Sequence, residues 1–350
     1  MTSDAEYKSN KARSLIVGGS SAAVSTESKG ARLIDRMNED ALAAIDSTQR
    51  NLTPVMRLLG EYELYEEDYQ QLHIWALDFT EDGYPVTALE LADRLDACAR
   101  SHDLSWIRLG RVKEVFFNSF SSDLKIKRLD LSNVPELTKL WCNKNQLTKL
   151  DLSSVPALTE LWCHENQLTE LDLSYTPALT VLMCEDNQLT ELNLTKVSKL
   201  QTLRCSHNLL TELDLTNVLE LNKLECYANK LIELDLTNVP KIRHLECHAN
   251  KLAKLDLTNV PEITYLECSV NQLAELDVTN ASKLQTLHCA YNLLPELDLA
   301  NLKDLITLSC YGNDLSELNL RNCDCFFQIN CGQAVKIIKN SDQNFQVERV

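Results

Sequence analysis

The chain has 350 residues, a formal net charge of −17 and 13 cysteines. Its acidic charge argues against nucleic acid and anionic membrane surfaces as partners, because both attract basic patches. We expect no membrane insertion, since no apolar run reaches the roughly 18 residues of a membrane span. The apolar run Leu15-Ile16-Val17 is too short for a signal-peptide core, which favours a cytoplasmic protein.

Residues 1–30 are rich in serine, alanine and glycine and show no apolar periodicity. Such a composition buries too little apolar surface to offset the entropy of ordering the chain. We therefore predict a disordered N-terminal segment. It is either an ordinary flexible terminus or an unstructured secretion signal.

Residues 31–122 have apolar side chains at helical spacing, which predicts a small helical domain. We expect helices from Pro54, over residues 62–77, from a capping box at Thr87 to about residue 99, and over residues 104–120. A repeat array exposes core at its ends, so we expect this domain to cap the repeats that follow. An independent docking role is the alternative.

A unit of 21 residues then recurs from about Ile126 to about Leu320. One copy, Leu158 to Leu168, reads LTELWCHENQL, and nine copies match L/I-x-x-L-x-C-x-x-N-x-L. The second half of each unit reads L-T-x-L-D-L, as in Leu168–Leu173, and is also predicted to be a strand. Residues 321–350 lose the pattern, which indicates a degenerate C-terminal cap.

This motif resembles the leucine-rich repeat, and its length resembles the bacterial class of 21-residue repeats with two nested half-motifs. The resemblance implies an α/β solenoid over residues 123–320, a horseshoe or arc of parallel strands behind the small N-terminal helical domain. It also implies a bacterial source. As an alternative to the cytoplasm, it implies an effector secreted into a host cell without a cleaved signal peptide.

A column is the set of residues at one equivalent position in successive repeats. Two columns that hardly vary indicate how each turn is built. Asparagine at the motif position is expected to satisfy backbone groups that no strand reaches. Ten cysteines share one inward position, where a thiol packs as a small hydrophobe, so we expect a reduced internal ladder. Stacked cysteines do not converge on a tetrahedral point, so we predict neither zinc nor any other metal or cofactor. The ladder is Cys142, Cys163, Cys184, Cys205, Cys226, Cys247, Cys268, Cys289, Cys310 and Cys331.

The second half of the repeats carries most of the acidity, as in Glu170 and Asp172 of one unit. Stacked like charges are destabilising, so we expect solvation or local hydrogen bonds to relieve them. Solubility explains this face more simply than cation binding does.

Columns that change from turn to turn are free to serve a partner, and in this chain they flank the cysteine strand. Strand alternation turns them outward, onto the concave face if the family geometry holds. Large aromatic side chains there are typical interface anchors. Trp141 and Trp162 have an alternative role, since they can pack together or line the junction with the cap. The predicted protein-binding residues are Trp141, Trp162, His164, Arg204, His207, Glu225, Tyr227, His244, Glu246, His248, Tyr265, Glu267, His288, Tyr291 and Tyr311.

The function predicted from these columns is binding of another protein, by a chain that is monomeric alone. No nucleophile with a positioned base is visible in the sequence, and we predict no enzymatic activity. The alternative is an enzyme or regulator whose helical domain carries the activity and whose repeats act as substrate receptor.

Overall fold

The computed structural model divides the chain into two compact units, the second of which covers Pro54–Val350. The structure describes residues 56–350, with gaps at 60–61, 79, 82–83, 86, 102–106, 109–110, 118–124, 324–327, 341–342 and 344–345. The predicted disordered segment 1–30 and the first part of the predicted helical domain lie outside the described residues.

The N-terminal part of the second unit combines two helices with short strands. Leu72 and Trp75 of the first helix and Leu91 and Leu95 of the second are buried. The capping box at Thr87 is confirmed, because the Thr87 N–H donates to Glu90 Oε2 (2.7 Å) and the Glu90 N–H donates to Thr87 Oγ1 (3.2 Å). The elements are β1 (Met56–Leu59), β2 (Tyr62–Tyr65), α3 (Glu66–Asp78), β3 (Thr80–Glu81), β4 (Tyr84–Pro85), α4 (Ala88–Ser101), β5 (Ile107–Arg108) and β6 (Arg111–Val112).

Two of the helix predictions are wrong. Leu58 and Leu59, expected on a helix from Pro54, lie in β1, which pairs antiparallel with β2. The stretch predicted as a helix over residues 104–120 instead holds three short strands, β5, β6 and β7 (Glu114–Phe116). The buried residues of β7 suit an extended chain, and pairing of β7 with β8 overrides the helical spacing.

The repeats form a parallel sheet that begins at β7 and continues in chain order. Within the described residues twelve strands pair in this sheet, three more than the nine copies of the motif. Each repeat strand pairs with the residues 21 positions away, as Leu203 does with Leu182 and Leu224. The remaining strands are β8 (Lys139–Trp141), β9 (Glu160–Trp162), β10 (Val181–Met183), β11 (Thr202–Arg204), β12 (Lys223–Glu225), β13 (His244–Glu246), β14 (Tyr265–Glu267), β15 (Thr286–His288), β16 (Thr307–Ser309), β18 (Gln328–Cys331) and β20 (Gln346–Arg349).

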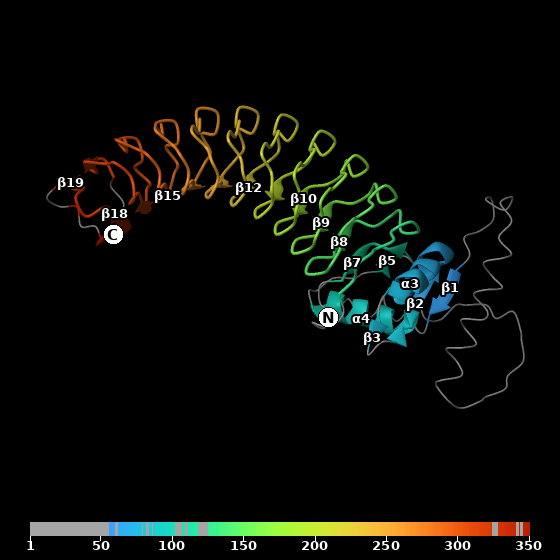
Figure 1. Ribbon diagram of the computed structural model, residues 1–350. Helices are drawn as coiled ribbons and strands as arrows, with labels where there is room; N and C mark the ends of the chain where they lie inside the picture. Colours follow the sequence, from blue (N-terminus) through green and yellow to red (C-terminus); the bar gives the residue numbers. More distant parts are fainter. Residues whose placement is uncertain are drawn as a thin grey trace, which may run out of the picture. The chain divides into compact units, whose positions relative to one another are not determined.

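The solenoid bends so that its sheet lines the inner, concave side and its loops form the outer side (Figure 1). The degenerate end continues the same pattern. β18 and β20 extend the sheet, and β17 (Glu317–Asn319) pairs with β19 (Lys336–Ile338) in a second, two-stranded sheet.

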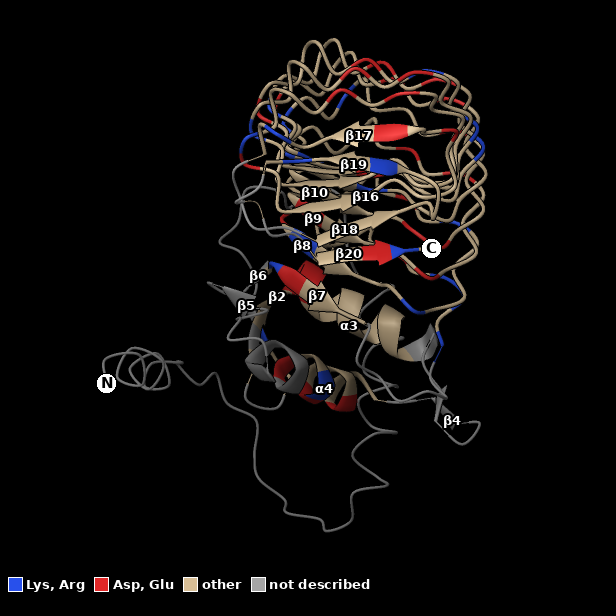
Figure 2. Cartoon of the chain, turned by 90° about the vertical axis from the view of Figure 1, so that its left-hand side faces the viewer, with Lys and Arg blue, Asp and Glu red and all other residues tan. Residues whose placement is uncertain are grey.

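The second halves of the repeats are not strands, contrary to the prediction. Among the described residues of the repeats, only β17 forms a strand there. Each aspartate instead closes a local turn, as Asp151 Oδ1 does by accepting the Ser153 N–H (2.9 Å). Hydrogen bonds from the Ser or Thr two residues later lower the pKa of Asp172 and Asp235. The expected relief of stacked charge is thus confirmed, and acidic residues recur along the loops opposite the sheet (Figure 2).

The interior is a continuous stack of leucines with the cysteine ladder inside it. The ladder cysteines from Cys142 to Cys331 are free and buried, as predicted. Burial raises the pKa of the Cys142 and Cys226 thiols to about 12, so they stay protonated.

The asparagine column joins successive turns as expected. Asn208 Nδ2 donates to the carbonyls of Cys184 (3.0 Å) and Cys205 (3.1 Å), and its Oδ1 accepts the Leu189 N–H (2.9 Å). One side chain therefore satisfies backbone groups of two turns.

Candidate functional site

The concave face is built from four positions in each turn. The first and third residues of each strand flank an inward leucine and point outward, because side chains alternate across a strand. The residue after each cysteine follows. The fourth position, just before the asparagine, has left-handed backbone, with φ of 51° in His207 and 53° in Tyr291. Gly312 occupies this position beneath Tyr291, whose ring would clash with any Cβ there.

The predicted residues form two groups of rings on this face. At the N-terminal end, the Trp141 and Trp162 rings stack 4.0 Å apart and 5° from parallel. Phe116 of β7 meets Trp141 edge-on, with ring centroids 4.6 Å apart, and Trp141 is only 7% exposed. Trp141 therefore packs at the junction with the cap, which is the alternative role given above for the two tryptophans. Trp162 is only partly buried.

The second group of rings extends from the turn of β11 to that of β16. Tyr227 stacks on His248 (4.3 Å) and meets His207 edge-on (5.1 Å). Tyr265 stacks on His244 (4.4 Å) and lies edge-on to His288 (6.0 Å). The last pair, Tyr291 and Tyr311, is also edge-on (5.0 Å). The rings of neighbouring turns thus support one another across the sheet.

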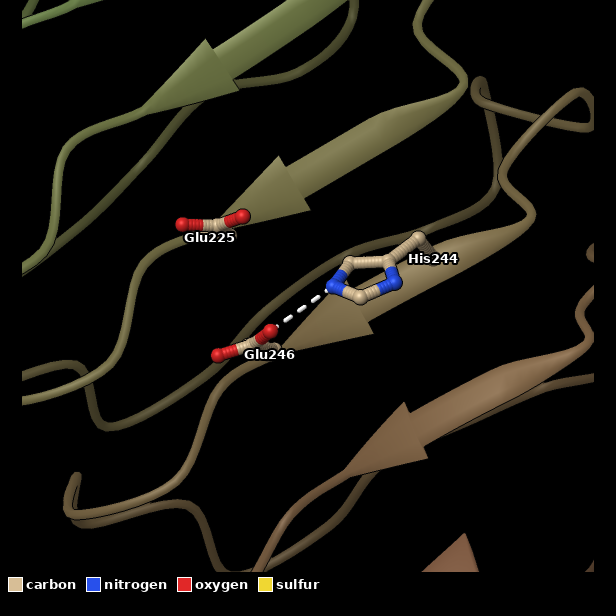
Figure 3. Close-up of side chains that lie close together, drawn as sticks. All are labelled: Glu225, His244 and Glu246. Atoms are coloured by element: carbon tan, nitrogen blue, oxygen red, sulfur yellow. Dashed lines mark hydrogen bonds and ion pairs between the residues drawn. The ribbon is translucent and has the colours of Figure 1, made fainter. Parts of the chain in front are cut away.

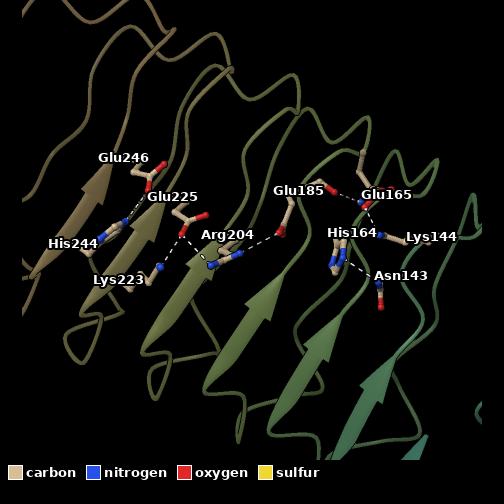
Figure 4. A network of polar contacts seen from close by, with 11 residues as sticks. Asn143, Lys144, His164, Glu165, Glu185, Arg204, Lys223, Glu225, His244 and Glu246 are labelled. Atoms are coloured by element: carbon tan, nitrogen blue, oxygen red, sulfur yellow. Dashed lines mark hydrogen bonds and ion pairs between the residues drawn. The ribbon is translucent and has the colours of Figure 1, made fainter. Parts of the chain in front are cut away.

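Polar side chains of the same face contact one another on neighbouring strands (Figure 4). Arg204 lies between Glu185 (3.9 Å) and Glu225 (3.3 Å), and Lys223 pairs with Glu225 at 2.9 Å. At the N-terminal end, Asn143 Nδ2 lies 2.9 Å from His164 Nε2.

Three carboxylates lie side by side in register on β12, β13 and β14. We call Glu225, Glu246 and Glu267 the glutamate row. Glu246 Oε1 is 2.7 Å from His244 Nε2, and Glu267 Oε2 is 2.6 Å from His288 Nδ1. The His244 hydrogen bond lowers the pKa of Glu246, so this carboxylate stays ionised. Burial opposes ionisation of Glu267, but hydrogen bonds from His288 and Ser269 leave its pKa lowered as well.

One group among the described residues has the ligand set of a metal site. An oxygen of Glu225, an oxygen of Glu246 and a nitrogen of His244 lie within 4.8 Å of one another (Figure 3). Two carboxylates and an imidazole suit a divalent cation. Arg204 and Lys223 already neutralise Glu225, however, so a cation would have to displace two ion pairs.

Sequence reasoning missed three residues of this face, Asn143, Glu185 and Ser206. All three directly follow a ladder cysteine, in the varied column that also supplied His164, Tyr227 and His248. We call these six residues the post-cysteine row. Rings, histidines and strand charges mark the predicted binding residues, and the small or acidic members of the post-cysteine row carry no such mark.

The missed residues carry buried polar atoms without a hydrogen-bond partner. In the described part of the chain eight side-chain atoms have this property, and every one belongs to an outward position of the sheet. Buried polar groups are normally paired, and exceptions call for an explanation. The atoms are Glu114 Oε2, Asn143 Oδ1, Trp162 Nε1, His164 Nδ1, Glu185 Oε2, Arg204 Nε, Ser206 Oγ and His248 Nδ1.

Burial also shifts the pKa values of three residues in the post-cysteine row. Desolvation raises the pKa of Glu185 to about 7, and the nearby Arg204 offsets this only in part. Burial lowers the pKa of His164 and of His248. At His248 the charges of Glu267 and then Glu246 act against burial without reversing it, and the hydrogen bond of Glu246 goes to His244.

Comparison with known proteins identifies the repeats. Residues 135–175 match a family model described as leucine-rich repeats in two copies. No curated protein matches the chain. Among solved structures, the functional domain of InlJ from Listeria monocytogenes, described as including a cysteine ladder, has 34% identity and a TM-score of 0.56. The match covers 68% of this chain and 54% of that chain.

Two further structures are similar to this chain. YopM from Yersinia enterocolitica WA-314 has 26% identity and a TM-score of 0.53 over 69% of this chain and 54% of that chain. The leucine-rich-repeat ectodomain of the Arabidopsis thaliana receptor kinase GASSHO1/SCHENGEN3 has 19% identity and a TM-score of 0.65, over 81% of this chain and 38% of that one. That match shows the fold alone.

The chain spans about half the length of the two bacterial structures. Among the described residues, no helix has both the length and the apolar character to cross a membrane. The repeat motif, the parallel sheet and these matches show that the chain has the fold of a leucine-rich-repeat solenoid with 21-residue turns.

Proposed function

We propose that the protein is a binding module for another protein, which it contacts through the concave face of the solenoid. One observation supports this most directly: the polar atoms that the described fold buries without a partner all belong to that face. A scaffold gains nothing from leaving them unpaired, because each costs about 1–3 kcal/mol. Function is the usual reason for such local costs.

The aromatic side chains support the same surface. Trp162, Tyr227 and Tyr265 are each partly buried and supported by a stacked neighbour, so little side-chain entropy is lost when a partner covers them. Interface anchors are commonly of this kind. A monomer that presents this face to a different protein is the simplest arrangement.

The similarity of the repeats to those of InlJ and YopM supports a bacterial source as part of this proposal. Secretion into a host cell would make the partner a host protein, and a cytoplasmic location would make it a protein of the source cell. Capture from lysates of both kinds separates these two cases.

The test is affinity capture with three baits: the wild type, a concave variant (Tyr227, His248 and Tyr265 all changed to Ala) and an outer-face variant (Glu191, Glu212 and Glu233 all changed to Ala). The outer three are exposed and lie in consecutive turns. We expect partners to be lost from the concave variant and kept by the other, with both variants folded by circular dichroism. Equal partner sets on all three baits would refute the proposal.

A further inference from the structure

The glutamate row has too little fixed positive charge around it. Neighbouring parallel strands lie about 4.8 Å apart, so three carboxylates in register repel one another. Arg204 and Lys223 both pair with Glu225, at one end of the row. Glu246 and Glu267 have only the histidines His244 and His288 as ion-pair partners among the described residues, and an imidazole carries a positive charge only when it is protonated, unlike the fixed charges of Arg204 and Lys223.

Beside the glutamate row lie further atoms that can accept hydrogen bonds. In the post-cysteine row, Glu185 Oε2, Ser206 Oγ and His248 Nδ1 are buried and unpartnered. Ser206 is only 1% exposed, so bulk water does not satisfy its hydroxyl. A carboxylate oxygen, a hydroxyl and a neutral imidazole nitrogen can all accept. Arg204 Nε, also unpartnered, can only donate and lies on a side chain already held between two glutamates, whereas the Ser206 hydroxyl can donate as well as accept.

Two tyrosine rings complete this part of the face. Tyr227 and Tyr265 are held by stacking on His248 and His244. Burial, and then the charge of the neighbouring glutamates, raises the pKa of both phenols, which places rings and carboxylates in one negative environment. Rings beside carboxylates suit a cation that can also lie flat on an aromatic face.

The ligand chemistry follows from this combination. A guanidinium group carries a positive charge, five N–H donors and no acceptor, and it stacks on aromatic rings. It would supply the missing charge and satisfy acceptors without leaving any acceptor of its own unpaired. A carboxylate or phosphate would add to the repulsion.

We propose that the concave face over β11 to β14 binds a basic segment of the partner protein, with an arginine side chain set against Glu246 and Glu267 beside the rings of Tyr227 and Tyr265. This rests on the proposed function, which it deepens by assigning the chemistry of the partner. The acidic outer face is a poor competitor for this role, because each of its aspartates already accepts local hydrogen bonds.

The test uses the full chain and a displayed library of random 12-residue peptides, each selected peptide being resynthesised with a fluorescent label. Binding is measured by anisotropy to the wild type and to two variants of equal charge change. In the first, Glu225, Glu246 and Glu267 are all changed to Gln. In the second, the exposed Glu191, Glu212 and Glu233 are all changed to Gln. Citrulline replaces arginine in a matched peptide, which removes the charge and keeps the shape.

We expect the selected peptides to be enriched in arginine, to bind the first variant at least 10-fold more weakly, and to bind the second within about twofold of the wild type. Citrulline should lower affinity by a similar factor. The first variant also loses the ion pairs of Glu225 and the histidine hydrogen bonds of Glu246 and Glu267. Circular dichroism at the assay temperature must therefore show that both variants are folded before their affinities are compared.

The other outcomes are separable. Peptides that need Trp162 or Tyr227 but lack basic residues would overturn this inference and leave the proposed function standing. Equal losses in both variants would mean attraction to net charge alone and would also overturn it. A selection that yields no peptide dependent on the concave face would overturn both.

Discussion

Adjacent residues of a single turn can differ completely in their role. Cys205 is buried and repeats through the ladder, whereas Ser206, the next residue, belongs to a row whose identity changes at every turn. The ladder and the asparagine column are fully packed or hydrogen-bonded. The outward positions leave polar atoms unpaired. The repeated columns therefore provide most of the stability of the fold. The varied columns can then carry unpaired polar atoms, which lower stability.

The strongest test of this contrast removes one asparagine. Asn208→Ala would leave a buried N–H of Leu189 and the carbonyls of Cys184 and Cys205 without their side-chain partner. We expect the free energy of unfolding to fall by about 3–5 kcal/mol, as several buried groups lose hydrogen bonds together. Urea denaturation followed by circular dichroism measures this.

Asn217→Ala is the control for that variant. Asn217 is exposed and bonds only to the neighbouring Thr216 hydroxyl, so we expect a change within about 0.5 kcal/mol. Similar losses in the two variants would show that the asparagine column is not special.

A smaller effect is expected inside the ladder. Cys226→Ser places a hydroxyl among leucines and thiols, and an unpaired buried hydroxyl costs about 1–3 kcal/mol. We expect unfolding at lower urea, with Cys226→Ala less affected because alanine adds no polar group. A serine variant as stable as the wild type would mean that the ladder position can satisfy a hydroxyl, contrary to the packing described above.

Glu185 should make stability depend on pH in a known direction. Its pKa is raised by burial from 4.5 to about 7, so the folded state binds this proton more tightly than the unfolded state does. The favourable contribution is complete below pH 4.5 and is lost as the pH rises to about 7. Glu185→Gln should therefore be more stable than the wild type at pH 8, by about 2–3 kcal/mol at most.

The same variant should differ least from the wild type at pH 4, below both pKa values, where Glu185 is mostly protonated in the folded and the unfolded state alike. Thermal unfolding at the two pH values measures the difference between the proteins. A constant difference across this range would show that the carboxylate is not the titrating group.

The smallest effect is expected at Ser206. Ser206→Ala removes a buried hydroxyl that has no partner, so stability should stay the same or rise by up to about 1 kcal/mol. A clear loss of stability would show that the hydroxyl is paired in solution, and the contrast between the two kinds of column would then weaken at this position.

The sequence predicts the role of the repeated columns well and that of the varied columns only in part. Asn166 and Cys163 recur at a fixed period, so their role can be inferred from any copy. The rings and charges of the concave face were found because they interrupt that regularity. The unpaired atoms of Asn143, Glu185 and Ser206 were not, because their burial depends on side chains 21 residues away in the neighbouring turns. The strand β7 was missed for a similar reason, since pairing with β8 decides its conformation.

The constant register has a consequence for how such a face can change. Because Leu203 pairs with the equivalent leucine of the turn on either side, loss or duplication of one 21-residue unit would rejoin matching strands, asparagines and cysteines. Removing residues 200–220, for example, would bring Met183 next to Glu225 and leave the ladder unbroken. Unequal recombination between repeats could thus remove, duplicate or reorder whole 21-residue turns. The concave surface would then change by inheritance while each remaining turn keeps its own packing.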